Sequence, residues 1–206
     1  MTSPVKKMHR TLLFAPGSRI ELLTKAQLGA ADAMIFDLED SVPLNAKAEA
    51  RQNVQQVLAL GLKKPMYLRI SNPRAGDYLA DLGVLHHQSL VNVAGVALPK
   101  ADDAQDIETV SKALQEIESK AGVALGSLSI LPMIETCLGL RNSFDIAKSS
   151  KRVSGMALAS AEQGDFMVDL GGRWTPRSLA LTYPRSKLVV DSRAAGVEWI
   201  VDGVFM

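Results

Sequence analysis

The sequence predicts an α/β fold of the TIM (β/α)8-barrel type, with about seven βα units in 206 residues. Short apolar runs alternate with amphipathic stretches, which indicates parallel strands joined by right-handed crossovers. Charged side chains gather just behind several of these runs, where barrel enzymes carry their chemistry. An open doubly wound sheet is the alternative, but the turn FAPGSR (14–19) contains one glycine and no GxGxxG motif. The barrel is therefore preferred.

Seven apolar segments have the length of strands, and most lack the two-residue alternation of a strand wetted on one face. This pattern predicts strands that are covered on both faces. The segments are 11–16, 33–39, 66–71, 93–100, 129–135, 153–160 and 198–205. A barrel of seven strands would expose unpaired strand edges, so we expect oligomer packing or a partner chain to cover them.

Five amphipathic stretches between the strands are predicted helices. They span 19–29, 46–61, 102–122, 138–150 and 176–196. The first three end at glycines, which are favoured just past helix C-termini. Pro184 should kink or delay the last helix. No low-complexity linker divides the chain, so we expect a single barrel domain over residues 1–206.

The composition limits the compartment and the partners. The chain carries 23 basic and 22 acidic side chains, and so lacks the basic excess of a nucleic-acid-binding protein. Its single cysteine, Cys137, fits a reducing compartment. The polar N-terminus has no signal-peptide core, and no apolar run approaches the ~18 residues that a membrane span needs. We expect a cytoplasmic protein with neither nucleic-acid nor membrane partners.

Polar side chains at the ends of the predicted strands form the candidate site. In chain order they are Asp37, Glu39, Asp40, Arg69, Lys100, Glu135, Glu162, Asp165 and Asp169. Structural alternatives exist for each. Asp40 and Ser41 could cap a helix, Arg69 could lie on an edge strand with its head group in water, and Lys100 could be an ordinary exposed lysine.

The acidic side chains are better explained together than singly. Several carboxylates in one barrel mouth repel one another, so cations must be present to keep them ionised. Mg²⁺ takes one or two protein carboxylates plus waters and substrate oxygens, and Glu135 and Asp165 could supply that pair. Arg69 then offers a bidentate fork for a substrate carboxylate. A metal ion and an arginine around a small acid suggest enolate chemistry.

Five segments in register resemble the HpcH/HpaI aldolase–citrate lyase β-subunit (CitE-like) family. They are RTLLFAPGSR (10–19), ADAMIFDLEDSVPLNAKAEAR (31–51), YLRISN (67–72), GVALPKADDAQDIETV (95–110) and LPMIETCLGLRN (131–142). The resemblance implies a TIM barrel, homo-oligomeric assembly and a Mg²⁺ cofactor. It also implies cleavage of a β-hydroxyacyl thioester on coenzyme A or an acyl carrier protein, and possible partner subunits of a lyase complex.

The resemblance assigns roles to individual residues. Glu135 resembles the first metal ligand of the family, and Arg69 resembles its carboxylate-binding arginine. Two further basic residues, Arg10 and Lys100, complete the expected substrate-binding set. The acidic motif that holds the expected catalytic residues consists of Asp37, Glu39 and Asp40.

Two departures from the family pattern leave alternatives open. The second metal ligand is assigned to Asp165 from the downstream register DFMVDLG, although counting from Glu135 favours Glu162, and Asp165 and Asp169 could simply share one face of a short helix. The family also continues past this sequence into an eighth strand and a C-terminal helical segment that supplies a catalytic acid/base. We therefore expect a barrel that stops short of both.

The leading functional hypothesis is a Mg²⁺-dependent carbon–carbon lyase for citryl-CoA, citryl-carrier-protein or citramalyl-CoA, acting by retro-Claisen chemistry. A class II aldolase acting on free oxo-acids is disfavoured, because that branch usually has a histidine at the position of Asp40. The alternative from another class is a catalytically silent subunit that binds a metal and an oxo-acid.

Overall fold

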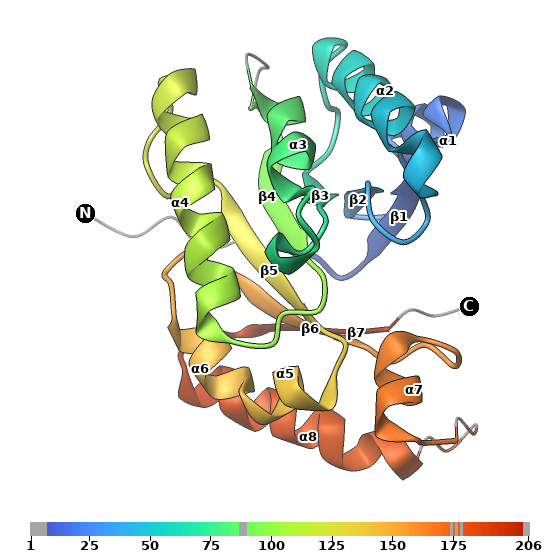
Figure 1. The fold of residues 1–206 in the computed structure, drawn as a ribbon, viewed down its shortest axis with the longest axis vertical. Helices are drawn as coiled ribbons and strands as arrows, with labels where there is room; N and C mark the ends of the chain where they lie inside the picture. The colour runs from blue at the N-terminus through green and yellow to red at the C-terminus, as the bar shows by residue number, and fades with distance from the viewer. Residues whose placement is uncertain (1–7, 87–89, 174, 176, 178, 204–206) are drawn as a thin grey trace.

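The seven strands of the computed structural model lie side by side in chain order and curl into an open half-barrel (Figure 1). The structure describes residues 8–86, 90–173, 175, 177 and 179–203. The strands are β1 (Leu12–Pro16), β2 (Ala33–Asp37), β3 (Met66–Arg69), β4 (Val93–Leu98), β5 (Ser129–Ile134), β6 (Gly155–Ala159) and β7 (Trp199–Gly203). All six pairings between neighbours are parallel. The predicted fold class, an incomplete barrel of seven strands, is confirmed.

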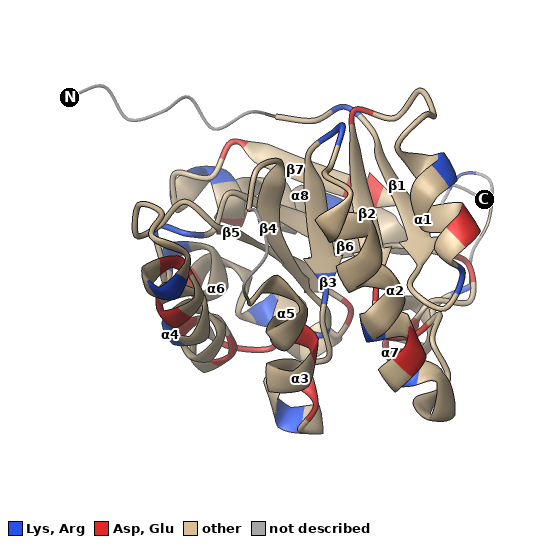
Figure 2. Ribbon diagram, turned by 90° about the horizontal axis from the view of Figure 1, so that it is seen from above, with Lys and Arg blue, Asp and Glu red and all other residues tan. Residues whose placement is uncertain are grey.

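Helices cover the convex face of the sheet (Figure 1). They are α1 (Ile20–Ala26), α2 (Lys47–Ala59), α3 (Tyr78–Leu82), α4 (Ala104–Ala121), α5 (Cys137–Arg141), α6 (Ser143–Lys148), α7 (Asp165–Leu170) and α8 (Leu179–Ala194). Charged residues of both signs occur along these outer helices (Figure 2). Among the described helices, none has both the length and the apolar character needed to cross a membrane.

The helices differ from the sequence-based expectation in detail. The stretch 138–150 forms two helices that meet at Asn142, whose side chain donates to the carbonyl of Asp102 over 2.8 Å. The short helices α3 and α7 fall outside the predicted helical stretches, because five or six residues show too little periodicity to be recognised. Helix α8 continues through Pro184. Its predicted start at 176–178 and the predicted strand end at 204–205 lie partly or wholly outside the described residues.

Alternating strand residues divide the core into two layers. In β2, Met34 and Phe36 pack outward under the helices, and Ile35 points into the barrel interior, so all five residues of this strand are buried. The interior layer also contains Tyr67 and Trp199. The strands are therefore covered on both faces, which explains their continuous apolar sequence.

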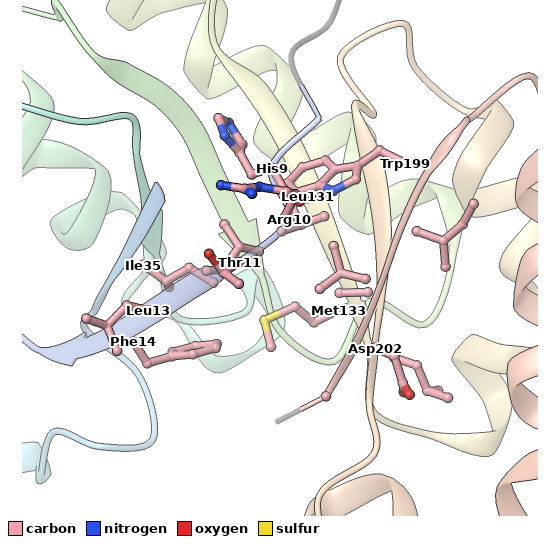
Figure 3. A pocket seen from close by; sticks show the side chains of 16 residues that line it. His9, Arg10, Thr11, Leu13, Phe14, Ile35, Leu131, Met133, Trp199 and Asp202 are labelled. Atoms are coloured by element: carbon pink, nitrogen blue, oxygen red, sulfur yellow. Dashed lines mark hydrogen bonds between the residues drawn. The ribbon is translucent and has the colours of Figure 1, made fainter. Parts of the chain in front are cut away.

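The segment just before β1 packs against β7, the last strand of the sheet, at one end of the barrel. The indole Nε1 of Trp199 in β7 donates to the carbonyl of His9 over 3.0 Å, and its ring lies 5.6 Å from the His9 ring. A cavity of about 550 Å³ lies between β1 and β7 and is lined mainly by apolar side chains of both strands (Figure 3). Gly155 makes room for the indole, since a Cβ atom there would lie 2.4 Å from the ring.

This close approach predicts an effect on stability. Gly155→Ala should lower the free energy of unfolding by ~1–3 kcal/mol, because the added methyl group collides with the Trp199 ring. The matched control is Gly83→Ala, where φ is −56° and no atom lies within 4 Å of the added Cβ, and where a change within ~1 kcal/mol is expected. Urea denaturation followed by tryptophan fluorescence measures both. Equal stability of the two variants would contradict this packing.

Candidate functional site

The parallel register brings the polar residues of successive strands to one rim of the half-barrel. Asp37, at the end of β2, pairs with Pro16 of β1 on one side and with Arg69 of β3 on the other. The turn after β1 must come close to this point. The amide of Gly17 donates to the carbonyl of Asp37 over 2.8 Å, and a Cβ atom on Gly17 would lie only 2.8 Å from the same oxygen. The single glycine of FAPGSR therefore positions the acidic loop.

A buried ion pair between Asp37 and Arg69 forms the base of the site. Arg69 Nε donates to Asp37 Oδ1 over 2.7 Å, and Nη2 donates to Oδ2 over 2.6 Å. The Asp37 carboxylate also accepts the amides of Glu39 (2.8 Å) and Ser41 (3.1 Å) and the Ser41 hydroxyl. Burial alone would raise the pKa of Asp37, but the hydrogen bonds from Arg69 and Ser41 hold it below its ordinary value. Asp37 thus anchors Arg69 and folds the acidic loop around itself.

Arg69 is held on three sides. The bidentate edge of its guanidinium is occupied by Asp37, and the ring of Phe14 lies 5.1 Å from its Cζ. Its remaining nitrogen, Nη1, lies 3.4 Å from Glu39 Oε2 and 4.0 Å from Asp40 Oδ2. Burial lowers the pKa of the guanidinium, but Asp37 and the neighbouring acids raise it overall, so Arg69 stays charged. Because Asp37 occupies the Nε–Nη2 edge that was expected to bind a substrate carboxylate, only Nη1 is directed toward Glu39 and Asp40.

Glu135, directly after β5, is a buried carboxyl group with an unsatisfied oxygen. Its exposure is 3%, and its Oε2 atom has no hydrogen-bond partner. Burial, reinforced by the charges of Glu39 and Asp40, raises the pKa of Glu135 to about 8 in spite of Arg69 and Lys100. A buried polar oxygen without a partner is rare in folded proteins, and a bound ion or ligand is one of the features that account for it.

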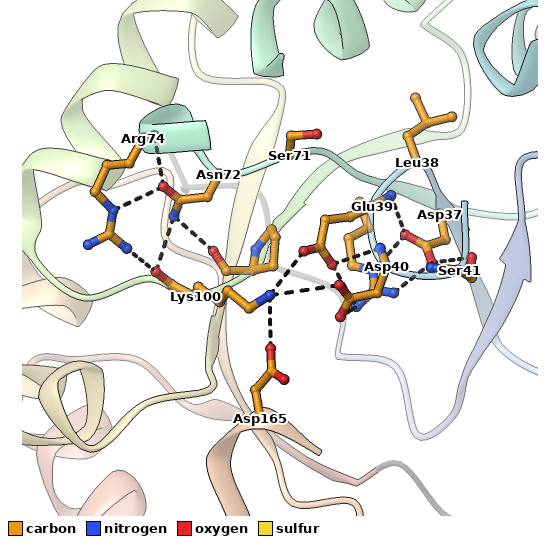
Figure 4. Close-up of polar contacts among 12 residues, drawn as sticks. Asp37, Leu38, Glu39, Asp40, Ser41, Ser71, Asn72, Arg74, Lys100 and Asp165 are labelled. Carbon is orange, nitrogen blue, oxygen red and sulfur yellow. Dashed lines mark hydrogen bonds and ion pairs between the residues drawn. The ribbon is translucent and has the colours of Figure 1, made fainter. Parts of the chain in front are cut away.

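Lys100 lies at the centre of the acidic residues (Figure 4). Its Nζ atom is 2.8 Å from Asp165 Oδ2, 3.3 Å from Glu39 Oε1 and 3.7 Å from Asp40 Oδ1. Burial lowers the pKa of this ammonium group, but its hydrogen bond to Asp165 and the charges of the surrounding carboxylates raise it overall. For Glu39, burial dominates and raises the pKa of the carboxyl group, with the Asp40 charge acting in the same direction.

Most of these groups line a cavity of about 270 Å³ at the carboxyl ends of the strands, and Glu39 and Lys100 contact its lining residues Arg69 and Asp165. It is bounded by Phe14, Pro16, Asp37, Asp40, Ser41, Arg69, Met133, Glu135, Ala159, Ala161, Gly164 and Asp165. Asp165 is the first residue of α7 and its side chain is half exposed, whereas the exposed Glu162 does not line this cavity. The structure thus brings together all of the predicted site residues except Arg10, Glu162 and Asp169.

Arg10 and Asp169 have other contacts. Arg10 precedes β1 at the opposite end of the strand, is exposed and forms an ion pair with Asp32 at 2.7 Å. Asp169 accepts the backbone amide of Cys137 over 2.6 Å. Two residues that the sequence did not assign to the site, Phe14 and Ser41, contact it directly. Ser41 could have been found from its spacing to Asp37, since a carboxylate that begins a tight loop often accepts hydrogen bonds from the residues just after it.

The donors fit a hard divalent cation. Glu135 and Asp165 offer carboxylate oxygens to one cavity, and the unpartnered Oε2 of Glu135 is available for coordination. Within the described ranges, no group of three or more His, Cys, Asp or Glu side chains is arranged to hold a metal ion on its own. Two carboxylates suit Mg²⁺, which keeps several waters, and do not suit an ion that needs a complete protein cage.

Fold and site together define the class: a parallel α/β barrel-type protein with an acidic, arginine-containing site at the carboxyl ends of its strands. The model of the HpcH/HpaI aldolase/citrate lyase family matches residues 10–206. Citrate lyase subunit beta of Haemophilus influenzae is 33% identical over 195 residues, which are 93% of this chain and 65% of that protein. The chain therefore belongs to the HpcH/HpaI aldolase/citrate lyase family, as its motifs predicted.

Two further comparisons extend this result. The L-malyl-CoA/beta-methylmalyl-CoA lyase of Cereibacter sphaeroides is 32% identical over 176 residues, covering 84% of this chain and 54% of that protein. The solved structure of the citrate lyase beta subunit of Mycobacterium tuberculosis, complexed with oxaloacetate and magnesium, matches with a TM-score of 0.73 at 23% identity. The matched region covers 97% of this chain and 81% of the chain in that structure, and the match supports the fold. The chain spans 54% to 65% of the length of these curated relatives.

The raised pKa of Glu135 predicts a pH-dependent stability. The folded chain holds this proton up to a pH of about 8, and the unfolded chain releases it near 4.5, so deprotonation should lower the free energy of unfolding as pH rises between these values. Glu135→Gln removes this loss. In EDTA, its Tm should exceed that of the wild type by ~5 °C at pH 8.5 and by much less at pH 5.

The exposed Glu108 provides the matched control for this prediction. The Glu108→Gln variant should follow the wild type over the whole pH range, measured by differential scanning calorimetry. A Tm difference between Glu135→Gln and wild type that does not change with pH would show that Glu135 is not a strained, protonated carboxyl group.

Proposed function

We propose that the chain is a Mg²⁺-dependent lyase that cleaves a carbon–carbon bond of a β-hydroxyacyl thioester to give an oxo-acid and an acyl thioester. The observation that carries the proposal is Glu135: a buried carboxyl group with an unpartnered oxygen, beside the cavity that Asp165 and Arg69 also line. Family membership supports it, because relatives with 32–33% identity are citrate and malyl-CoA lyases.

Glu135 and Asp165 would hold the metal ion. When bound, Mg²⁺ would supply a Lewis acid that polarises the reacting oxygen and offsets the negative charge of the surrounding carboxylates. Both ligands must be ionised for this role, so loading would release the proton that Glu135 holds below pH 8. Assignment of Asp165 over Glu162 is supported by the cavity, which Asp165 lines and Glu162 does not.

Arg69 would bind the carboxylate of the oxo-acid part of the substrate. Because Asp37 occupies its Nε–Nη2 edge, the contact is proposed to be made by Nη1, the nitrogen nearest Glu39 and Asp40. Asp37 is then a positioning residue: it keeps the guanidinium charged and fixed in orientation before the substrate arrives.

Asp40 is the proposed base. Its side chain is 56% exposed and lines the cavity, whereas Asp37 is fully engaged by Arg69. In the cleavage direction, the hydroxyl proton of the substrate passes to the Asp40 carboxylate as the hydroxyl carbon becomes a carbonyl. The electron pair of the broken carbon–carbon bond moves to the thioester as an enolate, which then takes up a proton at carbon. Glu39 would partly neutralise the positive charges of Arg69 and Lys100, with which it forms ion pairs.

The acyl group and its carrier are proposed from the family branch. Citryl-CoA or citryl-carrier-protein is the first candidate and citramalyl-CoA the second, because the motif DLEDSV most resembles the citrate lyase branch. A relative named L-malyl-CoA/beta-methylmalyl-CoA lyase supports the coenzyme A thioester class. Partner subunits of a lyase complex are proposed on the same basis.

The proposed activity predicts a defined set of losses. With Mg²⁺ and citryl-CoA or citramalyl-CoA, oxo-acid release followed by a coupled dehydrogenase assay should fall at least ~100-fold in Glu135→Ala and Asp165→Asn and disappear with EDTA. Glu162→Gln, a nearby exposed control, should stay within about twofold of wild type. Mg²⁺-dependent binding of pyruvate without any cleavage would instead favour a silent binding subunit.

Self-association is proposed from exposed apolar side chains on α7 and α8. Val168, Leu179 and Tyr183 are large apolar side chains that are each about 70% exposed, and exposed apolar surface favours association. We expect a homo-oligomer in sedimentation velocity at micromolar concentration, and Tyr183→Lys should shift the population toward monomer. A wild-type protein that sediments only as a monomer would contradict this assembly.

A further inference from the structure

The backbone around Lys100 is built to hold this side chain over the site. Lys100 has a φ of +50°, in the left-handed region that non-glycine residues rarely adopt. Its carbonyl oxygen accepts hydrogen bonds from Asn72 Nδ2 at 3.1 Å and from Arg74 Nη2 at 2.7 Å. Strained backbone of this kind persists only where surrounding contacts enforce it, and it is concentrated at functional sites.

The ammonium group of Lys100 occupies a position among carboxylate oxygens from separate parts of the chain. Asp165 comes from α7, and Glu39 and Asp40 come from the loop after β2, yet all three lie within 3.7 Å of Nζ (Figure 4). The shortest contact, 2.8 Å, is to Asp165. The same carboxylate is proposed above as a metal ligand, and an ammonium group and a divalent cation at one oxygen repel each other.

We propose that Lys100 is the resident counter-ion of the metal-free site, displaced from Asp165 by the divalent cation and thereby freed to bind the anionic part of the substrate. This inference rests on the proposed function, because it requires the metal site. Beyond the proposed function, it implies that Lys100 and the metal ion compete for Asp165. It also implies that the metal ion binds before the oxo-acid.

The competing explanation is that Lys100 forms a purely structural ion pair. The two explanations predict opposite changes in metal affinity when the ammonium group is removed. If the Lys100 contacts only stabilise the loops, removing the ammonium group should disorder the carboxylates and weaken metal binding. If Lys100 competes with the metal ion, its removal leaves mutually repelling carboxylates that attract a cation more strongly. Substrate binding should then change in the opposite direction, because one positive charge has been lost from the site.

The test measures the two affinities separately by isothermal titration calorimetry, with Mn²⁺ alone and then with pyruvate at saturating Mn²⁺. Lys100→Met should bind Mn²⁺ about tenfold more tightly than wild type and bind pyruvate about tenfold more weakly. Lys100→Gln should behave in the same way, and it guards against a packing effect of methionine. The control is Lys112→Met, at an exposed lysine in α4. This variant should match the wild type in both titrations.

Each outcome has a distinct meaning. Weaker or unchanged Mn²⁺ binding in both neutral variants, with wild-type circular dichroism spectra and Tm, would overturn the counter-ion role and leave the proposed lyase intact. Tighter Mn²⁺ binding with unchanged pyruvate binding would overturn the substrate contact. Absence of Mn²⁺ binding in the wild type and in both variants would overturn the metal site, and with it both the proposed function and this inference.

Discussion

The buried ion pair between Asp37 and Arg69 is the interaction on which the rest of the site depends. It joins the ends of two neighbouring strands and orients the guanidinium toward the cavity, and its carboxylate accepts the amides that fold the acidic loop. Removing one partner from such a pair typically costs ~3–5 kcal/mol, because the other charge remains buried. The acidic residues of DLEDSV thus have unequal roles: Asp37 builds the site, and Asp40 faces its cavity.

Charge balance is the second constraint. Carboxylates from three parts of the chain meet at the rim, and the structure compensates for them in three ways: Arg69 is fixed by Asp37, Lys100 bridges the loops, and Glu135 holds its proton. A divalent cation would replace the compensation by Lys100 and by the Glu135 proton, and it would leave the Asp37–Arg69 pair in place. Burial raises the pKa of Glu135 and the neighbouring acids reinforce this shift, so a bound divalent ion would offset the like charge that follows the buried strand β2.

Much of the fold was predictable from the sequence, and the reasons are physical. The seven strands are continuous apolar runs, which only two-sided burial explains, and they occur where predicted. The short helices α3 and α7 were not predictable because five or six residues show too little periodicity, and the break at Asn142 was not predictable because it involves a tertiary contact with Asp102.

Within the site, the position of polar residues at predicted strand ends was enough to identify most of the site residues, but it did not predict which of them contact one another. The sequence could place Arg69 and Lys100 at the rim, yet it could not indicate that Asp37 occupies the arginine fork or that Lys100 bridges to Asp165. Arg10 was assigned through its motif alone, and it lies at the other end of β1 with Asp32. Spacing along the chain specifies which residues reach a rim, whereas the pairing of charges there is decided by three-dimensional distance.

Glu135 and Asp165 are proposed to bind one divalent cation. A crystal structure of the protein grown with Mn²⁺ in place of Mg²⁺, with anomalous diffraction data, tests it most directly. One anomalous peak is expected in the cavity, coordinated by a carboxylate oxygen of each residue, with the Lys100 ammonium group moved away from Asp165. A peak bound by Glu162, or no peak beside Glu135, would contradict it.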